Sequence, residues 1–388
     1  MKFNDNFKRL APSYLFRETD ERVKNAAARN PGMKFARLGT GDVTLPIPEF
    51  VTEAGVKAAY ELSRVGSFRG YPPARGYPFL ISAVEGYYRA RGITVDGDDI
   101  FISDGAKTDA AAVFDLFGAG SRVAYFDPSY PVYADVTAIK GMQGVAVSAN
   151  PGNGFLPPPD GIKADVILLC SPSNPTGVAF DKPALGTWVN HARETGAVIV
   201  YDAAYERYVS GDKPRSIYEI DGADEVAIEI CSLSKTFGFT GVRCGYTVVP
   251  KKLKVLHDAW SRHRSTCFNG VSYVTQRMAQ SALLRADEAS ANACVYAARA
   301  KKLYRSLTAA GLKAWGGDAP YVWLKVWSDS WGAFDTLLER GVITTAGCGF
   351  GSGGEGYLRL SSFCPPDEID RAIDVITDVF CKWRFLPQ

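Results

Sequence analysis

The part of the chain that most constrains the fold lies between about residues 100 and 250, where short apolar runs alternate with helix-like segments. Near-continuous apolar runs of this length are typical of strands that are buried on both faces of a sheet. Strands separated by helical segments favour a parallel arrangement. The runs are IFIS at 100–103, RVAYF at 122–126, DVILLC at 165–170, AVIVY at 197–201, VAIEIC at 226–231 and RCGYTVV at 243–249. We therefore predict an α/β fold with a mostly parallel sheet sandwiched by helices.

The pattern changes after this block. Residues 271–311 are rich in Ala, Arg, Leu and Lys and predict one or two long helices. Further on, we predict strands at 321–327 and 356–362 and helices near 331–340 and 366–383, which together would form a smaller α+β domain. We assign residues 45–285 to a large domain, and residues 1–44 and 286–388 to a small one.

Charge and hydropathy exclude two classes of partner. The net charge is only +2, and the basic runs Lys251-Lys252 and Arg262–Arg264 are short, so we expect solvated helix surfaces rather than a nucleic-acid interface. No apolar stretch approaches the roughly 18 residues that span a bilayer, and the N-terminus has no apolar core like that of a secretory signal. We expect neither a nucleic-acid partner nor a membrane.

The eight cysteines are widely separated, without a C-x-x-C pair or a neighbouring histidine that would complete a zinc site. Several of them lie in apolar runs, where a reduced thiol packs like a small hydrophobic side chain. We therefore predict no metal site, a reducing compartment and a cytoplasmic protein.

Lys235 is the most informative residue, because it follows a predicted buried strand within the string CSLSKTFGFTGVR at 231–243. A lysine at a strand end usually faces water, but here Ser232 and Ser234 add hydroxyl groups and Arg243 adds a guanidinium. Glycines at 238 and 241 let the backbone turn tightly and approach a ligand. These groups predict an anion pocket beside an amine, which suits a phosphorylated aldehyde bound to Lys235 as a Schiff base.

Two more polar residues follow predicted strands. Asp202 ends the run VIVYD, and acids at the carboxyl ends of parallel strands lie where open α/β sheets bind ligands. The alternative for Asp202 is a helix N-cap. Asn174 lies in the turn string SPSNPTG, which would bring it to the same sheet edge. Asp202 could keep the ring nitrogen of pyridoxal phosphate protonated, and Tyr205 could donate to its phenolic oxygen.

Two other segments carry candidate anion contacts. The string SDGAKTD at 103–109 follows a strand and opens a helix, so its backbone amides suit a phosphate. The string at 349–354 fits G-x-G-x-x-G but precedes a strand, whereas a dinucleotide fingerprint follows a strand and opens a helix. We interpret it as a flexible loop, which makes a nicotinamide enzyme the weakest alternative. The loop leads to Arg359, which either clamps a carboxylate or is a surface strand arginine.

With these residues in this order, the sequence resembles the fold-type I pyridoxal-phosphate enzymes of the class I/II aminotransferases over nearly the whole chain. The resemblance implies an aspartate aminotransferase-like large domain, pyridoxal 5′-phosphate as cofactor, and a homodimer with shared active sites. Lys235 would carry the cofactor and act as acid and base, with Asp202 at the ring nitrogen and Asn174 and Tyr205 at the ring hydroxyl. The other implied cofactor contacts are Ser232, Arg243, the amides of Ala106 and Lys107, the ring of Tyr130, and Tyr71 of the partner subunit.

Longer strings are similar to the LL-diaminopimelate aminotransferase family, among them LGTGD at 38–42, FRGY at 68–71, FISDGAK at 101–107 and STCFNGVSY at 265–273. That family uses glutamate to convert tetrahydrodipicolinate into LL-diaminopimelate, on the route to lysine. The likeness implies an amino acid and a keto acid as the small-molecule partners. It implies substrate contacts at Tyr14, Gly41, Lys107, Asn174, Arg359 and, across the dimer, Asn269.

One segment departs from that family. The family usually has Gly-Tyr-Gly-Pro followed by an acid, whereas this chain has Gly70-Tyr71-Pro72-Pro73-Ala74. The missing acid helps to hold the distal ammonium of diaminopimelate, and an unpaired cation in a dry site costs on the order of a few kcal/mol. One alternative function is therefore a pyridoxal-phosphate enzyme that acts on another amino acid, or that catalyses cyclisation or elimination. A second alternative is a binding protein that keeps only the scaffold.

Overall fold

The computed structural model describes residues 1–11, 15–39 and 41–382. Its largest element is a seven-stranded sheet with the strand order β2-β8-β7-β6-β5-β3-β4. All neighbouring strands from β7 to β4 run parallel, and β8 runs antiparallel to both β7 and β2. The strands are β2 (Ile100–Ser103), β3 (Arg122–Asp127), β4 (Gln143–Ser148), β5 (Val166–Cys170), β6 (Val198–Asp202), β7 (Ala227–Ser232) and β8 (Gly245–Val248). The predicted α/β class and mostly parallel sheet are confirmed.

Both faces of the large sheet are buried, which explains the continuous apolar runs. Ile167 and Leu169 of β5 pack on one face, and Val166 and Leu168 pack on the other. One face is covered by α3 (Pro78–Arg89), α6 (Lys182–Thr195) and α9 (Tyr273–Leu284), and the opposite face by α4 (Ala106–Ala112), α5 (Pro131–Ile139) and α8 (Lys254–Cys267). Alternate residues of each central strand therefore enter two separate cores.

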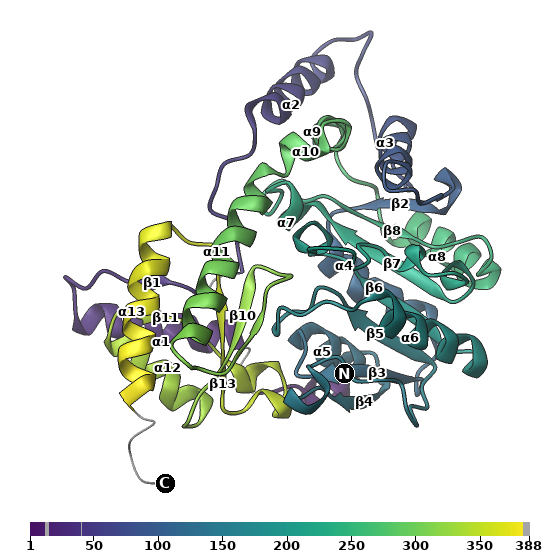
Figure 1. Ribbon diagram of the computed structural model, residues 1–388. Coiled ribbons are helices and arrows are strands. Elements are labelled where there is room, and N and C mark those ends of the chain that lie inside the picture. Colours follow the sequence, from purple (N-terminus) through teal and green to yellow (C-terminus); the bar gives the residue numbers. More distant parts are fainter. Residues whose placement is uncertain (12–14, 40, 383–388) are drawn as a thin grey trace.

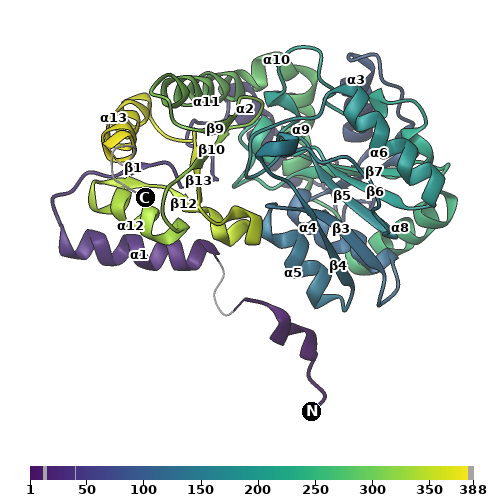
Figure 2. The ribbon, with the colours of Figure 1, turned by 60° about the horizontal axis from the view of Figure 1, so that its bottom comes forward.

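A second unit with its own core lies beside the large sheet (Figure 1). It contains a four-stranded sheet of order β12-β13-β10-β9 and the parallel pair β1-β11. Its strands are β1 (Ala36–Arg37), β9 (Ala314–Gly316), β10 (Tyr321–Lys325), β11 (Val342–Ile343), β12 (Thr345–Ala346) and β13 (Tyr357–Ser361). Figure 2 shows the surrounding helices α1 (Leu15–Arg29), α11 (Ala291–Ala309), α12 (Ser330–Glu339) and α13 (Pro366–Lys382). The residue boundaries assigned to the two domains stay a prediction.

Local sequence explains where several helices begin and end. Helix α13 starts at Pro366, whose fixed φ suits a first turn, and Asp367 and Glu368 complement the positive end of the helix. The predicted long helical region at 271–311 contains three helices, because Arg285 leaves the helical conformation between α9 and α10 (Ala286–Ala289), and Ser290 leaves it between α10 and α11. The remaining helices are α2 (Glu49–Leu62) and the single turn α7 (Leu233–Thr236).

Across residues 1–11, 15–39 and 41–382, no helix combines the length and the apolar character needed to cross a membrane. These ranges also contain no group of three or more His, Cys, Asp or Glu side chains placed to hold a metal ion. All eight cysteines are free thiols.

Candidate active site

A cavity of about 310 Å³ opens at the carboxyl ends of β5, β6 and β7. Its volume is at the lower end of the range for small-molecule sites. Because these strands run parallel, the segments that follow them meet at one sheet edge, as the sequence predicts. Ten predicted site residues line the cavity: Gly41, Ala106, Lys107, Tyr130, Asn174, Asp202, Tyr205, Ser232, Lys235 and Arg243.

Lys235 projects from α7, directly after β7. The hydroxyl of Ser232, at the N-cap of this turn, accepts a hydrogen bond from the Ser234 amide at 3.1 Å. The Lys235 Nζ donates to the carbonyl of Gly41. Burial lowers the pKa of the Lys235 amine to about 8, and the nearby guanidiniums of Arg359 and Arg243 act in the same direction against the carboxylate of Asp42. The amine is therefore a good nucleophile near neutral pH.

Asp202 is 6% exposed at the end of β6. It accepts hydrogen bonds from the hydroxyl of Tyr133 at 2.6 Å and from the amide of Ala204 at 3.0 Å. Burial raises the pKa of the Asp202 carboxyl, and these two hydrogen bonds oppose the rise. The N-cap alternative is wrong, because the next helical turn, Glu206–Tyr208, has Tyr205 at its N-cap. A buried carboxylate of this kind gains from a cationic partner in the cavity.

Sequence analysis missed Tyr133, which orients Asp202. Tyr133 lies three residues after Tyr130, and the two rings meet edge to face at a centroid distance of 5.7 Å. Both residues lie at the start of α5, with Tyr130 at its N-cap position. The available signal was this helical spacing, because residues three apart share a helix face.

Arg359 is 1% exposed, so the alternative of a surface strand arginine is wrong. Its Nη1 donates to Oδ1 of Asn174 at 3.0 Å, and its Nη2 donates to the carbonyl of Gly39 at 2.9 Å. Within the described part of the chain, the buried Nε of Arg359 has no hydrogen-bond partner. The guanidinium also lies 4.4 Å from the ring centroid of Tyr321, whose hydroxyl is 3.0 Å from that of Tyr205. A buried guanidinium with an unused donor is suited to a carboxylate.

Two glycines let a second group of donors converge. A Cβ on Gly105, whose φ is +132°, would lie 2.5 Å from Nη2 of Arg243. A Cβ on Gly245 would lie 2.9 Å from the Cα of Gly105. The guanidinium of Arg243 therefore reaches the segment before α4 and also donates to the hydroxyl of Ser234 at 3.2 Å. Hydroxyls, backbone amides and a guanidinium in one cradle are the donor set of a phosphate site.

A buried ion pair joins α8 to α4, the helix whose first amides belong to this cradle. Asp109 of α4 accepts from Arg264 of α8 at 3.3 Å and from the hydroxyl of Thr247 at 2.7 Å. The side chains of Asp109 and Arg264 are 0% and 2% exposed. The expectation that the run Arg262–Arg264 is a solvated surface is therefore wrong at Arg264. The guanidinium of Arg264 packs on the ring of Phe268, with its central carbon 3.7 Å from the ring centroid.

Among the predicted site residues that the structure describes, Tyr71, Asn269 and Arg359 do not line the cavity, and Arg359 is connected to it through Asn174. Tyr71 is 89% exposed, and Asn269 is also exposed. A Cβ on Gly270 would lie 2.8 Å from Cγ of Pro72, so the segments that carry Tyr71 and Asn269 pack against each other on the outer surface. Tyr14 lies outside the described residues. The assignment of Tyr71 and Asn269 to a partner's site stays a prediction.

The glycine-rich string at 349–354 contacts the end of strand β3 in the large sheet. It forms two short 3-10 helices, Gly347–Phe350 and Ser352–Gly354, rather than an irregular loop. The carboxylate of Asp127, at the end of β3, accepts from the amide of Gly353 at 2.9 Å and from the hydroxyl of Ser352 at 2.6 Å. The string therefore docks the small sheet on the large one, and its glycines allow a close approach that a Cβ would block.

Comparisons with known proteins agree with this geometry. Residues 34–376 match the family described as aminotransferase class I and II. The chain belongs to the class I and II aminotransferases. This aminotransferase is 42% identical to an LL-diaminopimelate aminotransferase from Agathobacter rectalis, over 97% of this chain and 99% of that protein.

Solved aminotransferase structures superimpose on nearly the whole chain. L,L-diaminopimelate aminotransferase from Chlamydomonas reinhardtii superimposes on this aminotransferase with a TM-score of 0.92 and 40% identity, covering 98% of this chain and 99% of that one. A Thermus thermophilus aspartate aminotransferase mutant superimposes with a TM-score of 0.86 at 24% identity, over 98% of this chain and 100% of the other, which supports the fold alone. The aspartate aminotransferase-like fold is confirmed.

Proposed function

We propose that this aminotransferase is pyridoxal-phosphate dependent and makes LL-diaminopimelate from tetrahydrodipicolinate and glutamate, a step on the route to lysine. The observation that carries the proposal is one cavity that holds the amine of Lys235, the carboxylate of Asp202 and the guanidinium of Arg243. The names of two relatives that match nearly the whole chain at 42% and 40% identity support the choice of substrate.

The cavity fits pyridoxal phosphate at each of the cofactor's polar groups. The cradle of Ser232, Ser234, Arg243 and the amides of Ala106 and Lys107 suits its phosphate. Asp202 suits the ring nitrogen, and Tyr205 and Asn174 suit the ring hydroxyl. When bound, the cofactor supplies an electron-poor ring that stabilises negative charge on the substrate α-carbon.

The protein's own groups bind the substrate and move the proton. Arg359 holds the α-carboxylate, with Asn174 fixing one end of its guanidinium. The Lys235 amine takes the proton from the substrate α-carbon and returns it later, which requires a neutral amine at working pH. At pH 7.5, a pKa of about 8 leaves about a quarter of such amines neutral, against about one in a thousand for an ordinary lysine.

The pH dependence of cofactor capture tests this property of Lys235. The rate at which cofactor-free protein attaches pyridoxal phosphate should rise with pH, pass its midpoint near pH 8 and level off about one unit higher, because the neutral amine is the reacting form. Stopped-flow absorbance of the cofactor across pH 6 to 11 gives the midpoint. A midpoint near the ordinary lysine value would show that Lys235 is not the reacting amine or is not desolvated.

A homodimer follows from the same proposal. Several large apolar side chains of α2 and the segment after it are exposed, with exposed fractions of 65% for Tyr60, 102% for Val65, 62% for Phe68 and 89% for Tyr71. A row of exposed apolar side chains favours an interface with another copy. In that dimer, Tyr71 and Asn269 reach the partner's cavity. The free thiols agree with the proposed cytoplasmic location.

The second ammonium of diaminopimelate needs an anionic partner, and Ala74 does not supply one. Two carboxylates line the cavity, Asp202 and Asp42. Asp202 is buried and committed to Tyr133 and Ala204, whereas Asp42 is exposed at the opening, next to Gly41. Asp42 therefore takes the distal ammonium in the proposed complex, which keeps diaminopimelate as the substrate despite the change at residue 74.

The variant Asp42→Asn separates this contact from the rest of the site. The KM for LL-diaminopimelate should rise about three- to fivefold, because an exposed charge-assisted hydrogen bond, worth up to about 1 kcal/mol, is lost. The KM for glutamate, which has no second ammonium, should stay within about twofold. Asp135→Asn is the matched control, because Asp135 lies near Lys107 but does not line the cavity. Equal changes for both substrates would rule out the assignment of Asp42.

The proposed function is tested by supplying LL-diaminopimelate and 2-oxoglutarate to the purified protein with pyridoxal phosphate and measuring glutamate. We expect steady glutamate formation. Absence of glutamate, together with attachment of the cofactor and a spectral response to a different amino acid, would favour the alternative of a recruited enzyme. A protein that never binds the cofactor would favour a binding protein.

A further inference from the structure

The turn that follows Asp202 touches the backbone of the catalytic lysine. This turn, Glu206–Tyr208, is a single 3-10 helix directly after Tyr205. The hydroxyl of Tyr208 donates to the main-chain carbonyl of Lys235 at 3.1 Å. A 3-10 helix of three residues has little stability of its own, so its place must be set by contacts outside it.

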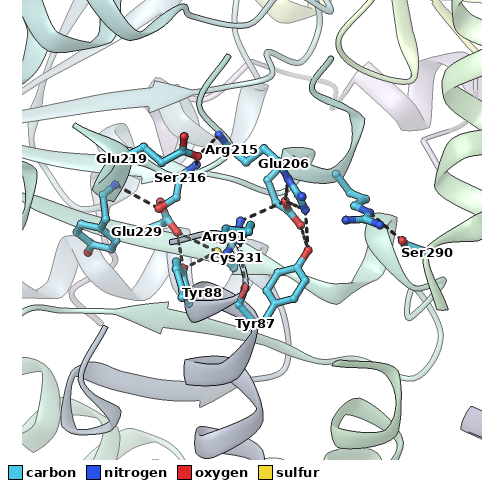
Figure 3. Close-up of polar contacts among 12 residues, drawn as sticks. Tyr87, Tyr88, Arg91, Glu206, Arg215, Ser216, Glu219, Glu229, Cys231 and Ser290 are labelled. Carbon is cyan, nitrogen blue, oxygen red and sulfur yellow. Dashed lines mark hydrogen bonds and ion pairs between the residues drawn. The ribbon is translucent and has the colours of Figure 1, made fainter. Parts of the chain in front are cut away.

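Glu206 supplies those contacts. Its carboxylate is 6% exposed and accepts a hydrogen bond from the hydroxyl of Tyr87 at 2.6 Å and another from Nε of Arg215 at 2.7 Å. Nη1 of Arg91 lies 3.5 Å away on the same carboxylate. Figure 3 shows Tyr87 from α3, Arg91 from the turn after α3, and Arg215 converging on Glu206. A buried carboxylate held by two guanidiniums and a hydroxyl has one well-defined position.

The same cluster reaches the lysine turn from a second side. The ring of Tyr87 meets the ring of Phe237 edge to face, with a centroid distance of 6.3 Å. The amide of Phe237 donates to the carbonyl of Leu233 at 2.9 Å, which closes the turn that contains Lys235. Glu206 is thus connected to this turn through Tyr208 and through Tyr87.

We propose that Glu206 is a positioning residue, which fixes the turn Glu206–Tyr208 and the ring of Tyr87 so that the Lys235 backbone and the Tyr205 hydroxyl keep their places in the cavity. The inference rests on the proposed function, because it concerns how Lys235 meets the cofactor. Glu206 does not line the cavity and is not a catalytic residue. Its effect passes through two contacts with the lysine turn, and precise placement of reacting groups requires such support.

A second buried carboxylate in the same region provides a matched control. Glu229, on β7, is 1% exposed and accepts hydrogen bonds from the hydroxyl of Ser216 at 2.7 Å and from the amide of Ile217 at 2.8 Å, as well as from Tyr88 (Figure 3). These contacts lie outside the turn Glu206–Tyr208. Glu229→Gln removes a buried charge as Glu206→Gln does, so both variants should lose stability.

The test is an absorbance titration that measures the dissociation constant of pyridoxal phosphate for the cofactor-free protein. It compares the single variants Glu206→Gln, Glu229→Gln and Tyr208→Phe. A double variant combines Glu206→Gln with Tyr208→Phe. Thermal unfolding of each protein reports folding. We expect the dissociation constant to rise about tenfold for Glu206→Gln and about threefold for Tyr208→Phe, and to change less than about twofold for Glu229→Gln. The double variant should bind about as weakly as Glu206→Gln alone, because the contact that Tyr208→Phe removes is one of the two through which Glu206 acts.

The outcomes separate the inference from the proposed function. Failure of the unsubstituted protein to capture the cofactor would overturn the proposed function itself. Capture by the unsubstituted protein, with equal weakening in Glu206→Gln and Glu229→Gln, would overturn the positioning role of Glu206. Additive effects of Glu206→Gln and Tyr208→Phe would also overturn it, because the turn would not connect the two residues. In the loaded enzyme, we expect kcat to fall in Glu206→Gln while the KM for glutamate stays within about twofold.

Discussion

Replacing Lys235 with alanine is expected to lower turnover with glutamate and a keto acceptor by at least about 10³-fold, because the substitution removes both the covalent attachment point and the general base. Lys235→Arg should be similarly inactive, since a guanidinium keeps the charge but stays protonated at any working pH. The measurement is kcat with glutamate in the presence of saturating pyridoxal phosphate.

The control for this prediction is Lys251→Ala. Lys251 lies outside the cavity, half-exposed, and pairs with Asp96 and Asp98. Its loss should leave turnover within about twofold, since exposed ion pairs contribute little. Turnover of Lys235→Ala above a tenth of the unsubstituted rate would contradict the role given to Lys235.

Asp202→Asn is expected to lower turnover by about 10²–10³-fold while the cofactor still binds. Asparagine keeps the size of the side chain but has no charge to hold the ring nitrogen protonated, so the ring becomes a weaker electron acceptor. The phosphate cradle is unchanged, and we expect the dissociation constant for pyridoxal phosphate to rise much less than turnover falls. Single-turnover kinetics with glutamate, combined with an absorbance titration, separate the two effects.

Tyr133→Phe is the graded comparison for Asp202. It removes one hydrogen bond to the carboxylate and leaves the charge, so we expect a loss of about tenfold or less. An Asp202→Asn variant no more impaired than Tyr133→Phe would mean that the charge of Asp202 has no special role. In that case Asp202 would be a structural acid at a strand end.

The central fold was predictable because its strands are buried on both faces. Each residue of VILLC in β5 enters a core on one side or the other, so the run is apolar without interruption. Strand β4, QGVAVS, was not predicted, since most of its residues are exposed at the edge of the sheet. An edge strand that mixes polar and apolar side chains lacks the uninterrupted apolar run that marks a buried strand.

The candidate site was predictable where it follows strands. Lys235, Asp202 and Asn174 were found because parallel strands bring their carboxyl ends to one edge. Tyr208 was not found, because its partner is a main-chain carbonyl 27 residues away along the chain. Arg264 was misassigned for a related reason, since its partner Asp109 is 155 residues away and no local pattern marks a buried ion pair.

The most direct test of the account is the identity of the amine that binds the cofactor. Protein incubated with pyridoxal phosphate is reduced with borohydride, digested and analysed by mass spectrometry. We predict a pyridoxyl phosphate group on the peptide that contains Lys235, at about one group per chain, and none on Lys107. An unmodified Lys235 peptide, or a label spread over surface lysines, would contradict the central claim.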